Sequence, residues 1–379
     1  MDPREALALH RAALVIDSLA PRATNDLLLT GAMRAAVDEW VRAGAARREI
    51  RARLGEMLVR ELSSSPEVRQ AYLDIWRRAG VTAASATQYG AGPPSEATTD
   101  AFRSIDMTQG LVDAFGGDFT IARRAADIEA AHARGGHAII MNLQNAAAFG
   151  DELALVETFY DLGIRIVQLT YNRRNLLGDG CTERADGGLS YFGVEVLHRL
   201  NGLRVLVDLS HCGEKTAWDA IRLSRAPVAF THTFSKALSS HDRGKSDEQI
   251  RAVAEGGGYI GVLLVPGFIQ AGEEATLDHV AAHVEHMVEV AGIDHVGIGT
   301  DYGAGYRLPE GVPTDRPGFD WVGFRPEHRT GPRYRVAGYA TWADWPNLTV
   351  HLAKRGFGAE DLRKIIGLNF LQVFCSAVG

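Results

Sequence analysis

The chain has few cysteines and no long apolar runs, and both shortages narrow the classes of protein to which it can belong. Cysteine occurs three times in 379 residues, at Cys181, Cys212 and Cys375. An odd, small number in a long chain argues against a disulfide framework. No run of about 18 apolar residues occurs, and the first residues lack the basic and apolar regions of a secretory signal. We therefore expect a protein of a reducing compartment, located in the cytoplasm and without a membrane partner.

The sequence also lacks long runs of like charge. Its net charge is −7 and its pI is about 6.0, so we expect no nucleic-acid partner. Hydrophobic residues make up 46% and charged residues 23%, which is an ordinary globular composition. Glycine, in contrast, is abundant at 41 residues, and it gathers at the ends of apolar runs, where tight turns need it.

Short apolar runs alternate with segments of helical length along the chain. We predict strands at 14–17, 82–89, 138–145, 165–172, 204–212, 228–234, 259–266 and 295–301. We predict helices between them at 152–162, 193–201, 214–223, 247–255 and 277–290. Several strands are apolar throughout, as in a parallel sheet buried on both faces. Eight alternations favour an α/β fold of the (β/α)8 (TIM) barrel type, with a doubly wound open sheet as the alternative.

Two segments interrupt this regular spacing. Residues of about 31–80 have a charged, helical pattern, and residues of about 303–340 are rich in Gly, Pro, Arg and Tyr. We interpret the first as a helical insertion after the first strand and the second as a long loop after the last strand. No linker or repeat divides the chain, so we predict one domain over 1–379.

Polar residues stand where the predicted strands end, which is where a parallel barrel carries its catalytic groups. These residues are Asp17, Gln144, Tyr171, Asn172, Asp208, His211, His232 and Asp301. One histidine at a strand end is most often structural. Two on consecutive strands, together with Asp301 on the last strand, favour a metal site or an acid–base site.

Several nearby residues have plainer interpretations. We expect Cys212 to be a buried, inert thiol and Cys181 to be an ordinary loop thiol. Strand alternation predicts that Asp208 points away from His211 and makes a buried hydrogen bond in the barrel wall. The sequence identifies no partner for Asp17.

Ordered motifs along the chain resemble those of the membrane (renal) dipeptidase family. They are Phe159-Tyr-Asp-Leu-Gly-Ile-Arg165, Thr170-Tyr-Asn172, Asp208-Leu-Ser-His211, the strand from Pro227 to His232, Arg243, Gly297-Ile-Gly-Thr-Asp301 and Gly367-Leu-Asn-Phe370. The likeness extends from about residue 137 to the end and is weak before it. It implies an amidohydrolase-like (β/α)8 barrel and, in typical members, a two-zinc centre that hydrolyses dipeptides. A homodimer is also an expectation from this resemblance.

The chain departs from the family pattern where the metals bind. The resemblance places Leu19 and Pro21 where the family has a His-x-Asp ligand pair, and neither side chain has a donor atom. Gln144 stands in place of the carboxylate that bridges the two zinc ions, and Tyr171 stands in place of a histidine that assists the substrate carbonyl.

Other positions match the family. The resemblance gives His211 and His232 the role of zinc ligands, Asp301 the role of acid–base residue, and Arg243 the role of holding the substrate carboxylate. Tyr171, Asn172 and Tyr302 complete the set of expected substrate contacts.

Charge then limits the number of metal ions. Two zinc ions bring four positive charges, and Asp301 is the one carboxylate at the matched positions, so a two-metal centre would bury uncompensated charge. We expect at most one ion, held by His211, His232 and an oxygen of either Gln144 or Asp301. A metal-free site in which the histidines and Asp301 act as acid and base is the alternative.

Three functions follow from these alternatives. The first is a metal-dependent hydrolase that acts on a dipeptide or small amide bearing a carboxylate. The second is a family member that has lost hydrolysis and performs tautomerisation or isomerisation on a peptide-derived metabolite. The third is a catalytically silent binding protein.

Overall fold

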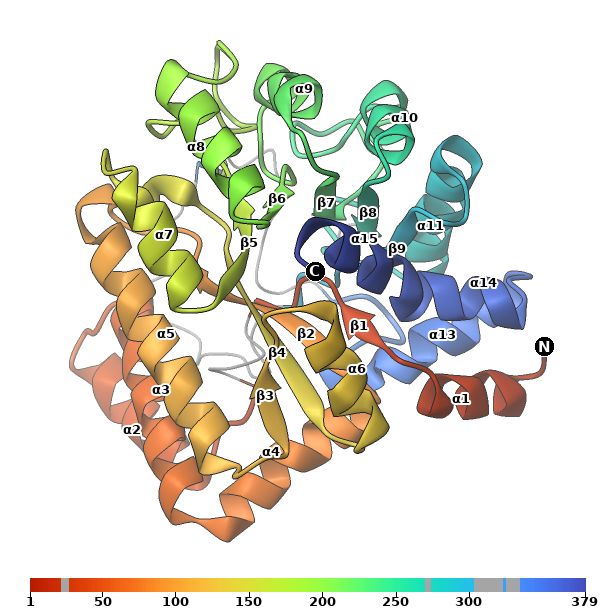
Figure 1. Ribbon diagram of the computed structural model, residues 1–379. Helices are drawn as coiled ribbons and strands as arrows, with labels where there is room; N and C mark the ends of the chain where they lie inside the picture. The colour runs from red at the N-terminus through yellow and green to blue at the C-terminus, as the bar shows by residue number, and fades with distance from the viewer. Residues whose placement is uncertain (22–26, 270–273, 303–322, 325–334) are drawn as a thin grey trace.

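The computed structural model describes the chain except for residues 22–26, 270–273, 303–322 and 325–334 (Figure 1). Eight parallel strands form the barrel in the order β1-β2-β4-β5-β6-β7-β8-β9. Their bounds are Ile16–Asp17 (β1), Ala83–Tyr89 (β2), His137–Leu143 (β4), Ile164–Gln168 (β5), Leu206–Asp208 (β6), Val228–Thr233 (β7), Tyr259–Val262 (β8) and Val296–Ile298 (β9). Backbone hydrogen bonds also join the two ends of this order, because Ser18 N donates to Ile298 O (3.0 Å) and Asp301 N donates to Leu19 O (2.9 Å). The predicted barrel fold is therefore confirmed.

Helices surround the barrel and connect its strands (Figure 1). They include α1 (Pro3–Ala12), α5 (Ala97–Ala114), α6 (Ala125–Ala133), α7 (Ala154–Asp161), α8 (Tyr191–Gly202), α9 (Glu214–Leu223), α10 (Asp247–Glu255), α11 (Leu277–Ala291), α13 (Trp345–Lys354), α14 (Ala359–Arg363) and α15 (Asn369–Ala377). No helix in the described part of the chain is long and apolar enough to cross a membrane.

The helical insertion lies between β1 and β2, as predicted. It consists of α2 (Gly31–Arg42), α3 (Arg47–Ser64) and α4 (Pro66–Ala79). The Ser65 side chain accepts a hydrogen bond from Val68 N (3.2 Å) at the start of α4, and Pro66 is its first residue. A serine N-cap followed by proline is a typical helix start. The predicted loop at 303–340 lies mostly outside the described residues.

One strand was not predicted. β3 (Phe119–Ile121) lies off the barrel order and pairs in parallel with β4. It contacts the start of β4, from His137 to Ile139, whereas β5 pairs with β4 from Met141 onward. Three residues are too few for a periodic signal.

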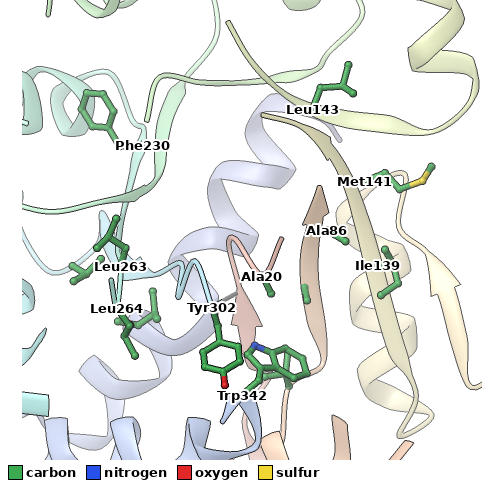
Figure 2. Close-up of a cluster of buried hydrophobic side chains, with 14 of the residues drawn as sticks. Ala20, Ala86, Ile139, Met141, Leu143, Phe230, Leu263, Leu264, Tyr302 and Trp342 are labelled. Carbon is green, nitrogen blue, oxygen red and sulfur yellow. The ribbon is translucent and has the colours of Figure 1, made fainter. Parts of the chain in front are cut away.

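Side chains of the strands alternate between two apolar clusters. Ala138 and Ile140 of β4 belong to a smaller cluster that includes Phe370 of α15. Ile139 and Met141 of the same strand belong to the larger cluster, part of which Figure 2 shows. Burial on both faces explains why the strand sequences are apolar without alternation.

Candidate active site

His211 and His232 come together at the ends of neighbouring strands. His232 lies in β7 and His211 follows β6, and both side chains are buried. Their Nε2 atoms are 2.9 Å apart. Two nitrogens bound to one tetrahedral zinc ion at about 2.0–2.1 Å would lie about 3.3 Å apart, so this separation is close to that of two ligands of one ion.

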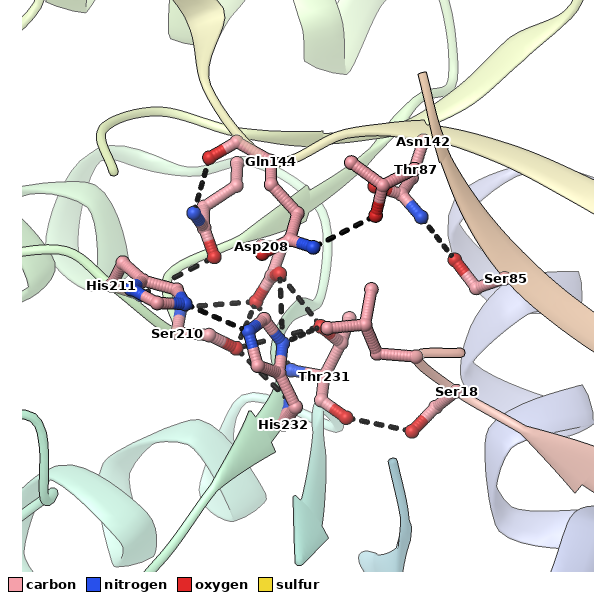
Figure 3. Close-up of polar contacts among 12 residues, drawn as sticks. Ser18, Ser85, Thr87, Asn142, Gln144, Asp208, Ser210, His211, Thr231 and His232 are labelled. Atoms are coloured by element: carbon pink, nitrogen blue, oxygen red, sulfur yellow. Dashed lines mark hydrogen bonds and ion pairs between the residues drawn. The ribbon is translucent and has the colours of Figure 1, made fainter. Parts of the chain in front are cut away.

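Hydrogen bonds fix the other side of each ring, and Figure 3 shows those on the His232 side. His211 Nδ1 lies 2.6 Å from Asn172 Oδ1, and His232 Nδ1 lies 2.9 Å from Thr231 Oγ1. The Thr231 hydroxyl donates to Asp208 Oδ2 (2.6 Å). Asp208 Oδ1 in turn accepts from Ser210 N and Thr231 N, each at 3.0 Å.

The positions of the hydrogen atoms in this hydrogen-bond network determine whether a hydrogen atom lies between the two histidine Nε2 atoms. Asn172 Oδ1 is an acceptor, so His211 Nδ1 carries a hydrogen. The Thr231 hydroxyl gives its single hydrogen to Asp208, so His232 Nδ1 carries a hydrogen as well. Two neutral imidazoles arranged in this way have no hydrogen on either Nε2. The two lone pairs therefore face each other across 2.9 Å, and this gap calls for a cation.

Both histidines are suited to remain neutral. Burial lowers the pKa of His211 and of His232 well below the ordinary value, and the positive charge of Arg243 lowers both pKa values further. Neutral imidazole is the form that binds metal ions. Hydrogen bonds from the far ring nitrogens to oxygen atoms are also the usual support of metal-binding histidines.

Two buried cations lie behind the pair. The Arg243 side chain is fully buried, and its terminal nitrogens donate to Ser210 O and to His232 O (2.5 Å). Lys245 is also buried, and its Nζ donates to Cys212 O (2.8 Å). We predict that Arg243 holds a substrate carboxylate. In the structure its two terminal guanidinium nitrogens bind backbone carbonyls instead. Its Nε has no partner among the described residues.

Strand alternation gave the wrong direction for Asp208. The ladder of β6 ends at Asp208, so the chain from Leu209 to Cys212 no longer alternates. Asp208 Oδ2 consequently lies 3.8 Å from His232 Nδ1 and supports the site. The predicted buried hydrogen bonds of Asp208 are present.

Tyr171 and Asn172 contact His211 directly. The Tyr171 ring stacks on the His211 ring, with centroids 4.1 Å apart and an interplanar angle of 19°. Cys181 Sγ lies 3.5 Å from Asn172 Oδ1, and burial raises the pKa of Cys181 to about 11. Cys181 is therefore a neutral thiol beside the site and is poorly suited to act as a nucleophile.

Carboxamides line the side of the site formed by β4 and β5. Gln168 donates through Nε2 to Gln144 O and accepts from His211 N (3.3 Å). Asn142 and Gln144 each donate to a hydroxyl of β2 (Figure 3). Asn142 donates to Ser85 Oγ (2.8 Å), and Gln144 donates to Thr87 Oγ1 (2.7 Å). Sequence reasoning missed Asn142 and Gln168, although both lie within predicted strands near the ends expected to carry the site.

Asp301 is held in an unusual backbone conformation. Its φ is +49°, which is rare for a residue other than glycine and is typical of functional positions. Its N–H donates to Leu19 O (2.9 Å), and its side chain is partly exposed. Its charge acts on the buried Arg243 guanidinium.

Asp17, which had no predicted partner, lies behind Asp301. Its buried carboxylate accepts from Thr300 N (2.9 Å) and Thr300 Oγ1 (2.7 Å). It also accepts from the indole nitrogens of Trp342 (2.8 Å) and Trp345 (3.2 Å). Burial raises the pKa of Asp17 to about 6, and the donors offset this only in part. The carboxylate thus ties β1 to β9 and to the start of α13.

Tyr302, a predicted substrate contact, packs next to the last strand of the barrel. Its side chain is buried, and its hydroxyl donates to Ala340 O (2.8 Å). Its ring packs against Tyr339, with centroids 5.8 Å apart. These contacts make Tyr302 part of the core next to the last strand.

The donor set does not fit a two-zinc centre. No group of three His, Cys, Asp or Glu side chains in the described part of the chain is placed to hold a metal ion. Leu19, at the end of β1, is buried and has no donor atom. The paired Nε2 atoms, in contrast, fit one cation.

The structure is thus that of a (β/α)8 barrel protein with a pair of buried histidines at the ends of neighbouring strands. Residues 77–316 match the family model described as membrane dipeptidase (Peptidase family M19). The chain belongs to this family. The matched region begins well before residue 137, where the motif resemblance was expected to start.

Relatives and solved structures agree with this assignment. A dipeptidase from Schizosaccharomyces pombe is 31% identical over 289 residues, which cover 74% of this chain and 63% of the relative. The dipeptidase tcpJ of Claviceps purpurea is 28% identical over 72% of this chain and 59% of its own length. The chain thus spans about three fifths of the length of these relatives. The crystal structure of an amidohydrolase from Pseudomonas aeruginosa matches over 100% of both chains, with 31% identity and a TM-score of 0.77.

A more distant structure shares the fold. It is a metallo peptidase from Rhodobacter sphaeroides liganded with a phosphinate mimic of the dipeptide L-Ala-D-Ala, with 22% identity and a TM-score of 0.70. The match covers 84% of this chain and 96% of that one.

Proposed function

We propose that this protein is a dipeptidase-like hydrolase that uses one zinc ion, held by His211 and His232, to cleave a dipeptide or small amide bearing a carboxylate. The observation that carries the proposal is the 2.9 Å separation of the two Nε2 atoms, with an oxygen atom next to each Nδ1. The dipeptide mimic bound to the Rhodobacter sphaeroides relative supports the substrate class.

The residues have the following proposed roles. Asp301 is the acid–base residue, because it is a partly exposed carboxylate at the end of the last strand. When bound, zinc polarises a carbonyl and lowers the pKa of its water to about 7. Tyr171 covers one face of His211 and Asn172 orients it.

Arg243 supplies positive charge for the substrate carboxylate. Its fork holds two backbone carbonyls, so in this arrangement the Nε–H is the donor that a carboxylate would meet. No third His, Cys, Asp or Glu side chain in the described part of the chain is placed to complete the site, so water or a substrate oxygen would fill the remaining positions of the ion. A cytoplasmic location and a homodimer remain predictions.

Metal content tests the proposal directly. We expect about one zinc ion per chain by elemental mass spectrometry of the purified protein, and loss of that ion in His211→Ala and in His232→Ala. His198→Ala, on the outer helix α8, is the matched control and should retain the ion. Turnover of a dipeptide panel should disappear together with the ion. Two ions per chain, or dipeptide turnover by the protein freed of metal, would overturn the single-ion mechanism.

A further inference from the structure

Two buried carboxamide oxygens at the end of β4 have no hydrogen-bond donor among the described residues. They are Asn142 Oδ1 and Gln144 Oε1, and neither has a partner within the described chain. Both side chains are more than nine-tenths buried, at 2% and 5% exposure. A buried polar atom without a partner destabilises the folded protein, so two such oxygens at the end of one strand indicate a ligand that donates hydrogen bonds.

The position of these oxygens connects them with the site. Their amide nitrogens donate to the hydroxyls of Ser85 and Thr87 in β2, so the amide oxygens are the atoms without a hydrogen-bond partner among the described residues. In Figure 3 the Gln144 side chain reaches toward Thr87 and the Asn142 side chain toward Ser85. A Cβ added at Gly90 would lie 3.6 Å from Gln144 Cβ and 3.9 Å from Tyr171 Cε2. Gln144 is therefore close to the ring that stacks on His211.

The charges around the site indicate whether these oxygens would accept a hydrogen bond from a charged ammonium group or from a neutral amide N–H. Arg243 and Lys245 are buried cations, and both lower the histidine pKa values through their charge. Asp208 and Asp301 balance them, and one divalent ion would leave a surplus of two positive charges. A free ammonium group would add a further positive charge to this surplus. A neutral amide N–H would meet the carboxamide oxygens without that cost.

We propose that the site selects amides whose amino side is blocked: N-acyl amino acids or N-acyl dipeptides, with the acylated N–H donated to Gln144 Oε1 or Asn142 Oδ1 and the carboxylate directed to the buried cations. This inference rests on the proposed hydrolytic function and specifies its substrate class. It predicts discrimination against the same dipeptide with a free amino group.

A matched substrate pair tests the inference. Alanyl-alanine and N-acetyl-alanyl-alanine differ only at the amino group, and kcat/KM should be at least tenfold higher for the acetylated form at pH 7. The ratio of the two values should narrow between pH 7 and pH 9, because a free α-amino group loses its charge near pH 8. Taking the ratio removes titrations of the protein itself. Calorimetry with the same pair should show tighter binding of the acetylated form, independently of turnover.

Variants at Gln144 test the assigned oxygen. Gln144→Glu adds a negative charge at that oxygen and should reduce the preference for the acetylated form at least tenfold. Gln144→Met removes the acceptor at similar volume and should weaken binding of the acetylated form. Gln109→Glu places the same charge on the exposed face of α5 and should leave the preference unchanged.

The outcomes separate the two proposals. Equal or better binding and turnover of the free dipeptide, with one ion per chain, would overturn the inference and leave the proposed function standing. Tighter binding of the acetylated form that Gln144→Glu reverses, in a protein that holds no ion and hydrolyses neither compound, would retain the inference and overturn the proposed function. A preference that Gln144→Glu and Gln144→Met do not alter would overturn the assignment of the oxygens.

Discussion

Replacing Asp17 with asparagine tests the structure at its most heavily hydrogen-bonded carboxylate. Oδ2 accepts from the Thr300 hydroxyl and from the indoles of Trp342 and Trp345, and Oδ1 accepts from the N–H groups of Thr300 and Leu19. Asparagine has one oxygen, and the Oδ2 position with its three donors is the better place for it. Its NH2 group then faces two backbone N–H groups, and both lose their acceptor.

The magnitude follows from these contacts. Two buried donors without acceptors cost about 1–3 kcal/mol each. The variant avoids burying a charge, which returns part of this cost, so we expect a net loss of about 2 kcal/mol of unfolding free energy at pH 7.5. The loss should grow at lower pH. In the folded protein the pKa of Asp17 is raised to about 6, above its value in the unfolded chain. Below pH 6 the folded state therefore binds this proton more tightly than the unfolded state does. The resulting stabilisation is lost as pH rises through 6.

Urea denaturation at pH 7.5 and pH 5 measures both effects. The difference between wild type and Asp17→Asn should increase by about 1 kcal/mol at pH 5. Asp151→Asn, at an exposed position, controls for loss of charge and should change stability by less than about 0.5 kcal/mol. A variant as stable as wild type, or a difference that shrinks toward pH 5, would refute this account of Asp17.

Two further substitutions address the site. Thr231→Val removes the hydroxyl between Asp208 and His232 and should weaken zinc binding about 10–100-fold in a competition titration. Thr231→Ser keeps the hydroxyl and should bind zinc as tightly as wild type. Equal zinc affinities for all three proteins would contradict the assignment of hydrogen atoms to the two histidine rings. Burial, with repulsion from a neighbouring guanidinium, lowers the pKa of Lys245 to about 8, so the unfolded chain holds this proton more tightly and stability should rise with pH from about 8 to 10. Lys245→Met should abolish that rise in urea denaturation at pH 7.5 and 9.5, and an identical rise in the variant would show that Lys245 is not its source.

The barrel was predictable because burial on both faces produces apolar runs at regular intervals. The same order placed His211, His232 and Asp301 at strand ends, since parallel strands bring their carboxyl ends to one edge. Strand ends were less predictable. The predicted strand at 204–212 shortens to Leu206–Asp208, and this difference reversed the expected direction of Asp208.

Contacts between distant residues could not be predicted from local pattern. The indole partners of Asp17 lie 325 and 328 residues away along the chain, and no motif spans that distance. The unpartnered oxygens of Asn142 and Gln144 depend on which amide end meets a neighbouring hydroxyl. The backbone carbonyl partners of Arg243 are equally hidden, because every residue type has a carbonyl.

Asp17 also has a consequence for how this protein can change over time. The stretch 303–334 is preceded by Thr300 and followed by Trp342, and both of these residues are fastened to the same carboxylate. None of these fastenings uses a residue from within the stretch. We therefore expect these hydrogen bonds to persist in a variant whose residues between Thr300 and Trp342 differ in number or composition.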